Sequence, residues 1–191
     1  MKKVSLSIVA LFSMLLLSSI VYSQDYNLDK TNSTITVSGT SSLHDWDVIS
    51  NDFSGKIQLK DFSTGHIENL EVYIASETLK SGKKAMDKKT YKALKTDEFE
   101  NITFSMVKIK SSKKIDDSTF EMRVEGKMTI CGVTKLKMID FLLIKSGKEL
   151  NATGSCIIKM TDFKVEPPTA LLGTIKTGDD ITIKFNAAFK N

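Results

Sequence analysis

Apolar and polar residues alternate along most of this chain, most clearly between residues 99 and 143. There the runs FENITFSMVKIK and FEMRVEGKMTI are separated by a short polar segment. An alternation with a period of two is typical of β-strands that have one buried face and one solvated face. Because the pattern recurs before and after this stretch, we predict an antiparallel all-β fold.

The alternating runs predict eight or nine strands, and one segment breaks the pattern. Between Ser81 and Asp97, apolar residues fall at helical spacing, which predicts one or two short helices. Antiparallel strands in this number form a sandwich or a closed barrel, and an eight-stranded barrel has an interior that side chains fill or that holds one ligand. The predicted strands are Tyr26–Asp29, Thr34–Thr40, Phe53–Leu59, Ile67–Ser76, Asn101–Lys110, Thr119–Ile130, Thr134–Ile144, Leu150–Met160 and Asp180–Phe189.

Residues 1–23 have the features of a secretory signal peptide. Two lysines precede an apolar run from Val4 to Val21, and cleavage is expected before Gln24. A retained membrane anchor is the competing interpretation. The remaining residues, 24–191, suit one domain with a full core and contain no second apolar run long enough to span a membrane. We therefore expect a periplasmic or secreted bacterial protein with no stable membrane span after cleavage.

The composition argues against a nucleic-acid partner and against catalysis. The net charge of +4 is small, and Arg123 is the sole arginine, so the sequence has no arginine cluster that would bind phosphate groups. Neither His44 nor His66 has a cysteine or a second histidine at metal-ligand spacing. No nucleophile motif and no convergent set of acids indicates an enzyme. We expect no catalytic residues, no metal and no cofactor.

Cys131 and Cys156 leave the question of a disulfide open. A secreted context permits one. If residues 135–145 and 150–160 pair as a hairpin, Cys156 lies near Met138, and Cys131 is about seven residues further along the strand, beyond the reach of a disulfide. Closure of a barrel would change this geometry. If unpaired, Cys156 is a small buried apolar residue.

Six methionines follow the signal peptide, and several fall on strand faces that the alternation predicts to be buried. One such face contains Met122, Val124 and Met128, and another is predicted to contain Met138 together with Asp140. Methionine is flexible and polarizable, which suits a surface that adapts to a long apolar guest. Ordinary core packing explains the same spacing, so both interpretations stay open.

Several short motifs together resemble the YceI-like family of secreted, lipocalin-like, polyisoprenoid-binding proteins. The most specific is GKMTICGVTK at residues 126–135, which is similar to the family pattern G-x-L-T-(I/L)-x-G-V-T-(K/R). The resemblance covers nearly all of residues 24–191. The other matching segments are Tyr26–Asp29 with Ser33–Ile35, Phe53–Ile57, Asp97–Phe104 and Asp162-Phe163.

The resemblance implies an extended, lipocalin-like barrel of eight antiparallel strands, with one or two short helices and a long apolar channel. A quinone, polyprenyl or fatty-acyl chain bound there would be carried or stored in the periplasm. The alternative is a non-enzymatic structural or interaction module whose barrel is filled by side chains. Trp46 or Tyr91 is expected at the mouth of the channel. The residues expected to line it are Met86, Leu94, Phe104, Met106, Met122, Met128, Leu136 and Met138.

The chain departs from the family pattern at positions associated with polar contacts. Where many members have Arg-Asp-x-His-Leu, this chain has Met86-Asp87 and lacks both the arginine and the histidine. A common K-H-x-x motif near the start is replaced by Ser42–Trp46. These differences favour a neutral quinone, a prenol or a fatty-acyl chain over a pyrophosphate. The expected partner is an apolar small molecule, and the sequence leaves the oligomeric state, including a dimer, open.

Overall fold

Eight antiparallel strands form a closed barrel in the part of the chain that this computed structural model describes, residues 23–170 and 173–191. The barrel order is β1-β4-β5-β6-β7-β8-β9-β11, and it closes because β11 pairs with β9 on one edge and with β1 on the other. The prediction of an eight-stranded barrel with a short helix is confirmed. The expected signal peptide lies outside the described residues, apart from Ser23.

Most elements follow the alternation pattern of the sequence. Helix α2 (Lys84–Leu94) occupies the segment with helical spacing. The pattern did not predict the short strands β3 and β10. The strands are β1 (Gln24–Leu28), β2 (Thr34–Ser41), β3 (Trp46–Ser50), β4 (Phe53–Asp61), β5 (His66–Ala75), β6 (Asn101–Lys114), β7 (Thr119–Ile130), β8 (Val133–Ser146), β9 (Glu149–Lys159), β10 (Thr169–Ala170) and β11 (Ile175–Lys190), and the 3-10 helices are η2 (Lys30–Asn32), η3 (Ser76–Thr78) and η4 (Thr161–Phe163).

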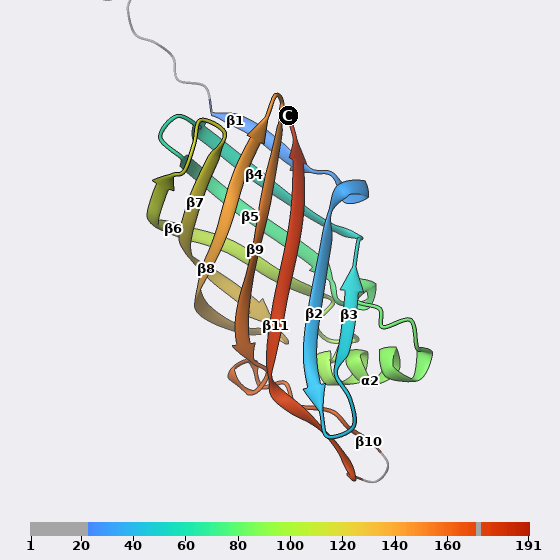
Figure 1. The fold of residues 1–191 in the computed structure, drawn as a ribbon. Helices are drawn as coiled ribbons and strands as arrows, with labels where there is room; N and C mark the ends of the chain where they lie inside the picture. Colours follow the sequence, from blue (N-terminus) through green and yellow to red (C-terminus); the bar gives the residue numbers. More distant parts are fainter. Residues whose placement is uncertain (1–22, 171–172) are drawn as a thin grey trace, which may run out of the picture.

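The wall of the barrel is built differently at its two ends. Near the C terminus β11 pairs with β1, whereas its earlier residues, from Thr177 to Asn186, pair with β2. Strand β2 continues into a hairpin with β3, outside the closed ring. Helix α2 and β10 lie beside this hairpin, at the end opposite the C terminus (Figure 1). Main-chain hydrogen bonds of 2.8 and 2.9 Å between Ile49 and Lys80 connect β3 to the segment that precedes α2.

A two-residue turn determines the register of the hairpin formed by β7 and β8. Cys131 and Gly132 have positive φ angles of 48° and 71°, as in the tight connections that match the twist of paired strands. Ile130 therefore pairs with Val133, and six residues further Val124 pairs with Ile139. Ile139, Phe141 and Leu143, at every second position of β8, consequently face the core.

The predicted inward face of β8 is therefore wrong. Leu136 and Met138 are 60% and 42% exposed. In the first half of the strand, Lys137 is on the same face as Ile139. This position tolerates a lysine because its ammonium pairs with Asp162 of η4 at 2.7 Å. Because a lysine stands on the inner face and apolar residues stand on the outer face here, the sequence pattern indicates the wrong face as buried.

Asp140 also lies on the outer face of β8. Its carboxylate accepts two hydrogen bonds, of 2.6 and 2.8 Å, from the guanidinium of Arg123 on β7. This pairing lowers the pKa of the Asp140 carboxyl. On the outer face, the Asp140 carboxylate therefore has a charged partner, which satisfies its need for one.

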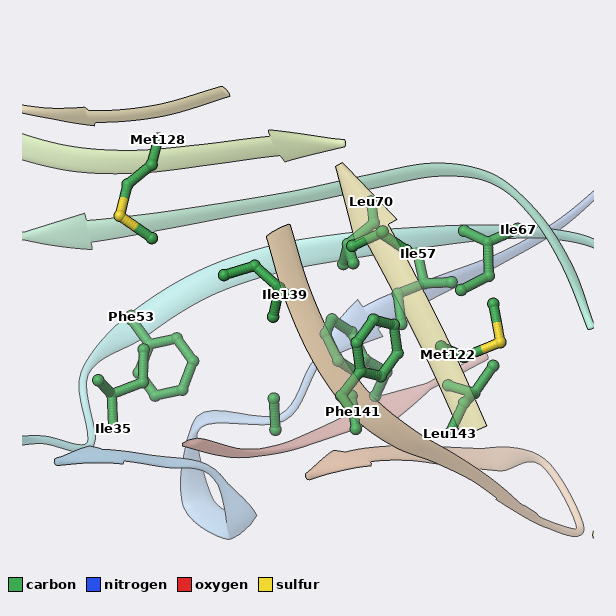
Figure 2. Close-up of a cluster of buried hydrophobic side chains, with 14 of the residues drawn as sticks. Ile35, Phe53, Ile57, Ile67, Leu70, Met122, Met128, Ile139, Phe141 and Leu143 are labelled. Atoms are coloured by element: carbon green, nitrogen blue, oxygen red, sulfur yellow. The ribbon is translucent and has the colours of Figure 1, made fainter. Parts of the chain in front are cut away.

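Side chains fill the closed end of the barrel. Leu143, Leu150 and Phe189 are at most 1% exposed and come from β8, β9 and β11. Figure 2 shows Met122 and Leu143 near Ile67 in this core, with Met128 on the other side of the cluster. Apolar burial of this extent stabilises the closed end, because each fully buried large side chain contributes about 1.5–3 kcal/mol.

Asp29 connects the first strand of the barrel to the last. Its carboxylate accepts hydrogen bonds from the Asn32 amide at 2.8 Å and the Thr31 main-chain nitrogen at 3.1 Å, and it pairs with Lys190 of β11 at 2.6 Å. The Lys190 ammonium, with these hydrogen bonds, holds the pKa of the Asp29 carboxyl well below its usual range.

The free energy of unfolding is expected to fall as the pH is lowered from about 5 to about 2, and to fall less in Asp29→Asn. The unfolded chain, in which this carboxyl has its ordinary pKa of about 3.9, takes up the proton first, so acid favours unfolding. Urea denaturation at a series of pH values measures the slope. Identical slopes in the two proteins would contradict the prediction.

Candidate binding cavity

A cavity of about 390 Å³ lies at the end of the barrel that β2, β3 and α2 surround. This volume falls within the range of about 300–1,000 Å³ that is typical of small-molecule sites. Strands β5, β6, β7, β9 and β11 complete its wall, and the lining is predominantly aliphatic. The site is therefore suited to an apolar guest.

A second cavity of about 110 Å³ lies deeper in the barrel. Its lining shares Ile35, Ile74, Ile102 and Ile183 with the larger cavity. The two cavities are therefore consecutive compartments, bounded by the same isoleucines. Together they provide an apolar interior that stops at the filled core of the closed end.

One wall of the larger cavity is formed by the inner faces of β11 and β2. Ile183 of β11 pairs with Val37 of β2, and Ile181 pairs with Gly39. β-Branched side chains at alternating positions favour the extended conformation and pack against their cross-strand neighbours. The same pattern that predicted these strands therefore supplies the apolar wall.

Trp46 lies at the rim, against Gly39. A Cβ atom on Gly39 would lie only 2.2 Å from the Trp46 ring, so the glycine provides the space for the indole. The indole Nε1 donates to the main-chain oxygen of Thr40 at 3.1 Å, which holds the ring in place. Of the two residues expected at the mouth, Trp46 lines the cavity and Tyr91 is not among its lining residues.

Helix α2 covers the cavity with one face. Its lining residues Met86, Thr90 and Leu94 are four residues apart, and Ala85, Lys89 and Ala93 repeat the same interval. No side chain of α2 is fully buried. The helix therefore lies over the cavity as a cover and is not embedded in the core.

Hydrogen bonds attach both ends of α2 to adjacent segments of the same chain. Near its start, the Asp87 carboxylate accepts hydrogen bonds from the nitrogen and hydroxyl of Ser81 at 2.7 and 2.6 Å. The Tyr91 hydroxyl donates to the main-chain oxygen of Glu77 at 3.0 Å, so Tyr91 anchors the helix. At the end of α2, the Cys131 thiol donates to the Leu94 oxygen at 3.0 Å.

Both cysteines are free thiols. Cys131 occupies the β7–β8 turn beneath the end of α2, and Cys156 lines the smaller cavity. Burial raises the pKa of the Cys156 thiol to about 11, so this residue is neutral at physiological pH and adds to the apolar lining. The question of a disulfide is thereby resolved in favour of two separate thiols.

Half of the predicted lining residues border the two cavities. Met86 and Leu94 line the larger cavity, and Phe104 and Met128 line the smaller one. Helical spacing in α2 and strand alternation in β6 and β7 placed these four residues on inward faces. Their contact with a ligand stays a prediction.

The other predicted lining residues lie elsewhere. Met122 is buried in the closed end, and Met106 packs against the core. Leu136 and Met138 lie on the outer surface, so their predicted place inside the barrel is wrong. None of the four lines either cavity.

Sequence reasoning missed lining residues that come from loops and short elements. Val48 belongs to the unpredicted strand β3, and Leu79 precedes α2. Phe163 and Val165 belong to η4 and the segment that follows it. The alternation of Trp46, Asp47 and Val48 was the available signal for β3, but no pattern marks the turns.

The residues that the structure describes, 23–170 and 173–191, contain neither a metal-ligand cluster nor a helix suited to crossing a membrane. No group of three or more histidine, cysteine, aspartate or glutamate side chains in this part of the chain could hold a metal ion. No helix here combines the length and the apolar character needed to cross a bilayer.

The sequence matches the YceI-like domain over residues 26–189. Comparison with curated proteins finds no match.

Solved structures share the fold. BcnA of Burkholderia cenocepacia superposes with a TM-score of 0.68 at 16% identity, over 84% of this chain and 98% of its own. A polyisoprenoid binding domain from Saccharophagus degradans, implicated in plant cell wall breakdown, gives 0.68 at 14% identity, over 86% and 97%. The YCEI protein of Campylobacter jejuni gives 0.58 at 22% identity, over 73% and 81%. At these identities the likeness is one of fold.

Proposed function

Because this chain belongs to the YceI-like domain family, we propose that it binds a polyisoprenoid or another long apolar lipid inside its barrel. The observation that carries the proposal is the apolar cavity of about 390 Å³ beneath α2, continued by the smaller cavity behind it. The similar domain from Saccharophagus degradans is a polyisoprenoid binding domain, which supports this class of ligand.

Burial supplies the binding free energy in this proposal. Each methylene group removed from water contributes about 0.8 kcal/mol, so a long hydrocarbon chain binds tightly with few polar contacts. Loss of the ligand's conformational freedom offsets part of this gain. The flexible thioethers of Met86 and Met128, one in each cavity, suit a guest whose shape varies.

The chain would act as a carrier or store of this lipid in the periplasm. The apolar run from Val4 to Val21, with two lysines before it, supports export. A binding role without catalysis accords with the lining, which has no convergent pair of acids among the described residues. The alternative, an interaction module with a filled barrel, is supported by the packed core of the closed end but not by the cavities.

Native mass spectrometry of the mature protein, purified from its own periplasm or culture medium and followed by organic extraction, tests the proposal. The expected result is one prenyl or acyl adduct per chain, whose mass identifies the ligand. A mass equal to that of the polypeptide, with no uptake of added quinone, prenol or fatty acid, would favour the interaction module.

A further inference from the structure

The formal charges at the rim of the larger cavity are all of one sign. Lys83, which precedes α2, and Lys89, in the middle of the helix, are among the lining residues. No aspartate or glutamate is among the described residues that line this cavity. His44, from the connection between β2 and β3, adds a third basic side chain. The rim is therefore positive or neutral everywhere, over an apolar interior.

The two lysines are not neutralised by the protein. Lys89 Nζ donates to the main-chain oxygen of Thr169 at 3.3 Å, a long hydrogen bond to an uncharged group. Among the described residues, neither Lys83 nor Lys89 forms an ion pair, although lysines elsewhere on the barrel do. The acid within α2, Asp87, binds Ser81 and lies outside the lining. Two ammonium groups thus remain available to a ligand.

Two hydroxyl groups that also line the cavity are less suited to an anion. The Thr90 hydroxyl donates to the Met86 oxygen at 3.2 Å, and the Ser41 hydroxyl donates to the His44 oxygen at 2.7 Å. These hydroxyl protons are already used within the protein. An ammonium group can donate to several acceptors at once and accommodates a carboxylate or a phosphate without a fixed geometry.

From this arrangement we infer that the bound lipid is a single-chain amphiphile with an anionic head group, a carboxylate or a phosphate. Its chain occupies the apolar cavity, and its head group lies at the rim against Lys83 and Lys89. The inference rests on the proposed function and adds the chemistry of the ligand's polar end. It revises the expectation of a neutral ligand. That expectation rested on the missing arginine and histidine at Met86-Asp87, whereas Lys83 and Lys89 supply positive charge on either side of this motif.

Three ligands that share one farnesyl chain test the inference on the mature protein: farnesol, farnesoic acid and farnesyl monophosphate. At low ionic strength, at least one of the two anions is expected to bind about tenfold more tightly than the alcohol. The preference is expected to shrink as salt is added, because salt screens exposed charges. A preference for carboxylate or for phosphate distinguishes a fatty-acid-like ligand from a prenyl phosphate.

A pair of double variants separates the rim lysines from the general charge of the helix. Lys83→Glu with Lys89→Glu is expected to remove the preference for anions, measured as the ratio of anion affinity to farnesol affinity in the same variant. The control, Lys84→Glu with Lys88→Glu, makes the same charge change on exposed residues of the same helix that do not line the cavity. It is expected to keep at least half of the preference. Thermal unfolding of both variants verifies that they are folded.

Two results would overturn the inference and leave the proposed function standing. One is equal affinity of the wild-type protein for the three ligands, and the other is the same loss of anion preference in both double variants. Failure of the wild-type protein to bind any of the three would overturn the proposed function as well.

Discussion

Replacing Ala93 with tryptophan is expected to reduce lipid binding by at least about a hundredfold while the barrel stays folded. Ala93 is partly buried on the face of α2 that covers the cavity. A tryptophan there would place its ring in the space that the proposed lipid occupies. Because α2 has no fully buried side chain, the larger residue enters the cavity without disturbing the packed core. Titration of the mature protein with farnesol measures the loss.

The matched control is Lys92→Trp, on the adjacent exposed position of α2. Lys92 does not line the cavity, so binding is expected to stay within about twofold of wild type. Similar thermal unfolding temperatures in the two variants would show that the helix and barrel are intact. If the Ala93 variant bound farnesol as tightly as the control, the lipid would not occupy the larger cavity.

Replacing Phe189 with alanine is expected to lower the free energy of unfolding by about 3–5 kcal/mol. Phe189 is 1% exposed and lies where the barrel closes, opposite Leu28 of β1 and Leu150 of β9. Removal of the ring loses its burial and leaves a cavity between three strands that cannot collapse freely. Urea denaturation monitored by circular dichroism measures the change.

Ile157→Ala is the control for this prediction. Ile157 is on β9, one of the strands that contact Phe189, but its side chain is 70% exposed on the outer surface. Its truncation is expected to change the free energy of unfolding by less than about 0.5 kcal/mol. A similar loss in both variants would contradict the assignment of the barrel closure as the packed part of the fold.

Strand faces were predictable where the alternation agreed with the pairing. Met122, Val124 and Met128 of β7 all point inward as predicted, and so do Ile181 and Ile183 of β11. In these strands polar side chains occupy the outer positions. The sequence therefore shows both that the segment is a strand and which of its faces is buried. The closed barrel itself followed from the number of such strands together with the family resemblance.

The phase of β8 was not readable from β8 alone. Both of its faces carry apolar residues. Leu136 and Met138 alternate with lysines on the outer face, and Ile139 and Phe141 lie on the inner face. Pairing resolves the ambiguity, because the Cys131-Gly132 turn places Ile139 opposite the inward Val124. A register argument from the turn would therefore have found the correct face.

The cavity was less predictable than the barrel. Its lining joins residues as distant in the sequence as Ile35 and Ile183, and only long-range pairing brings them together. Regular spacing predicted the contributions of α2, but Val48 and Phe163 belong to segments too short to show a period. Alternation also could not indicate which part of the interior is packed and which part is open, because Met122 and Met128 share one face of β7.

Strand β11 has a part in both ends of the molecule: its final residues close the barrel against β1, and its earlier residues form the cavity wall with β2. It is also the last strand of the described chain, so during synthesis neither the barrel nor the binding site can be completed before this segment emerges. The same dependence couples ligand occupancy to global stability. A bound lipid would resist unfolding of the whole barrel and not of one local segment, so saturation with ligand should slow hydrogen exchange in every barrel strand.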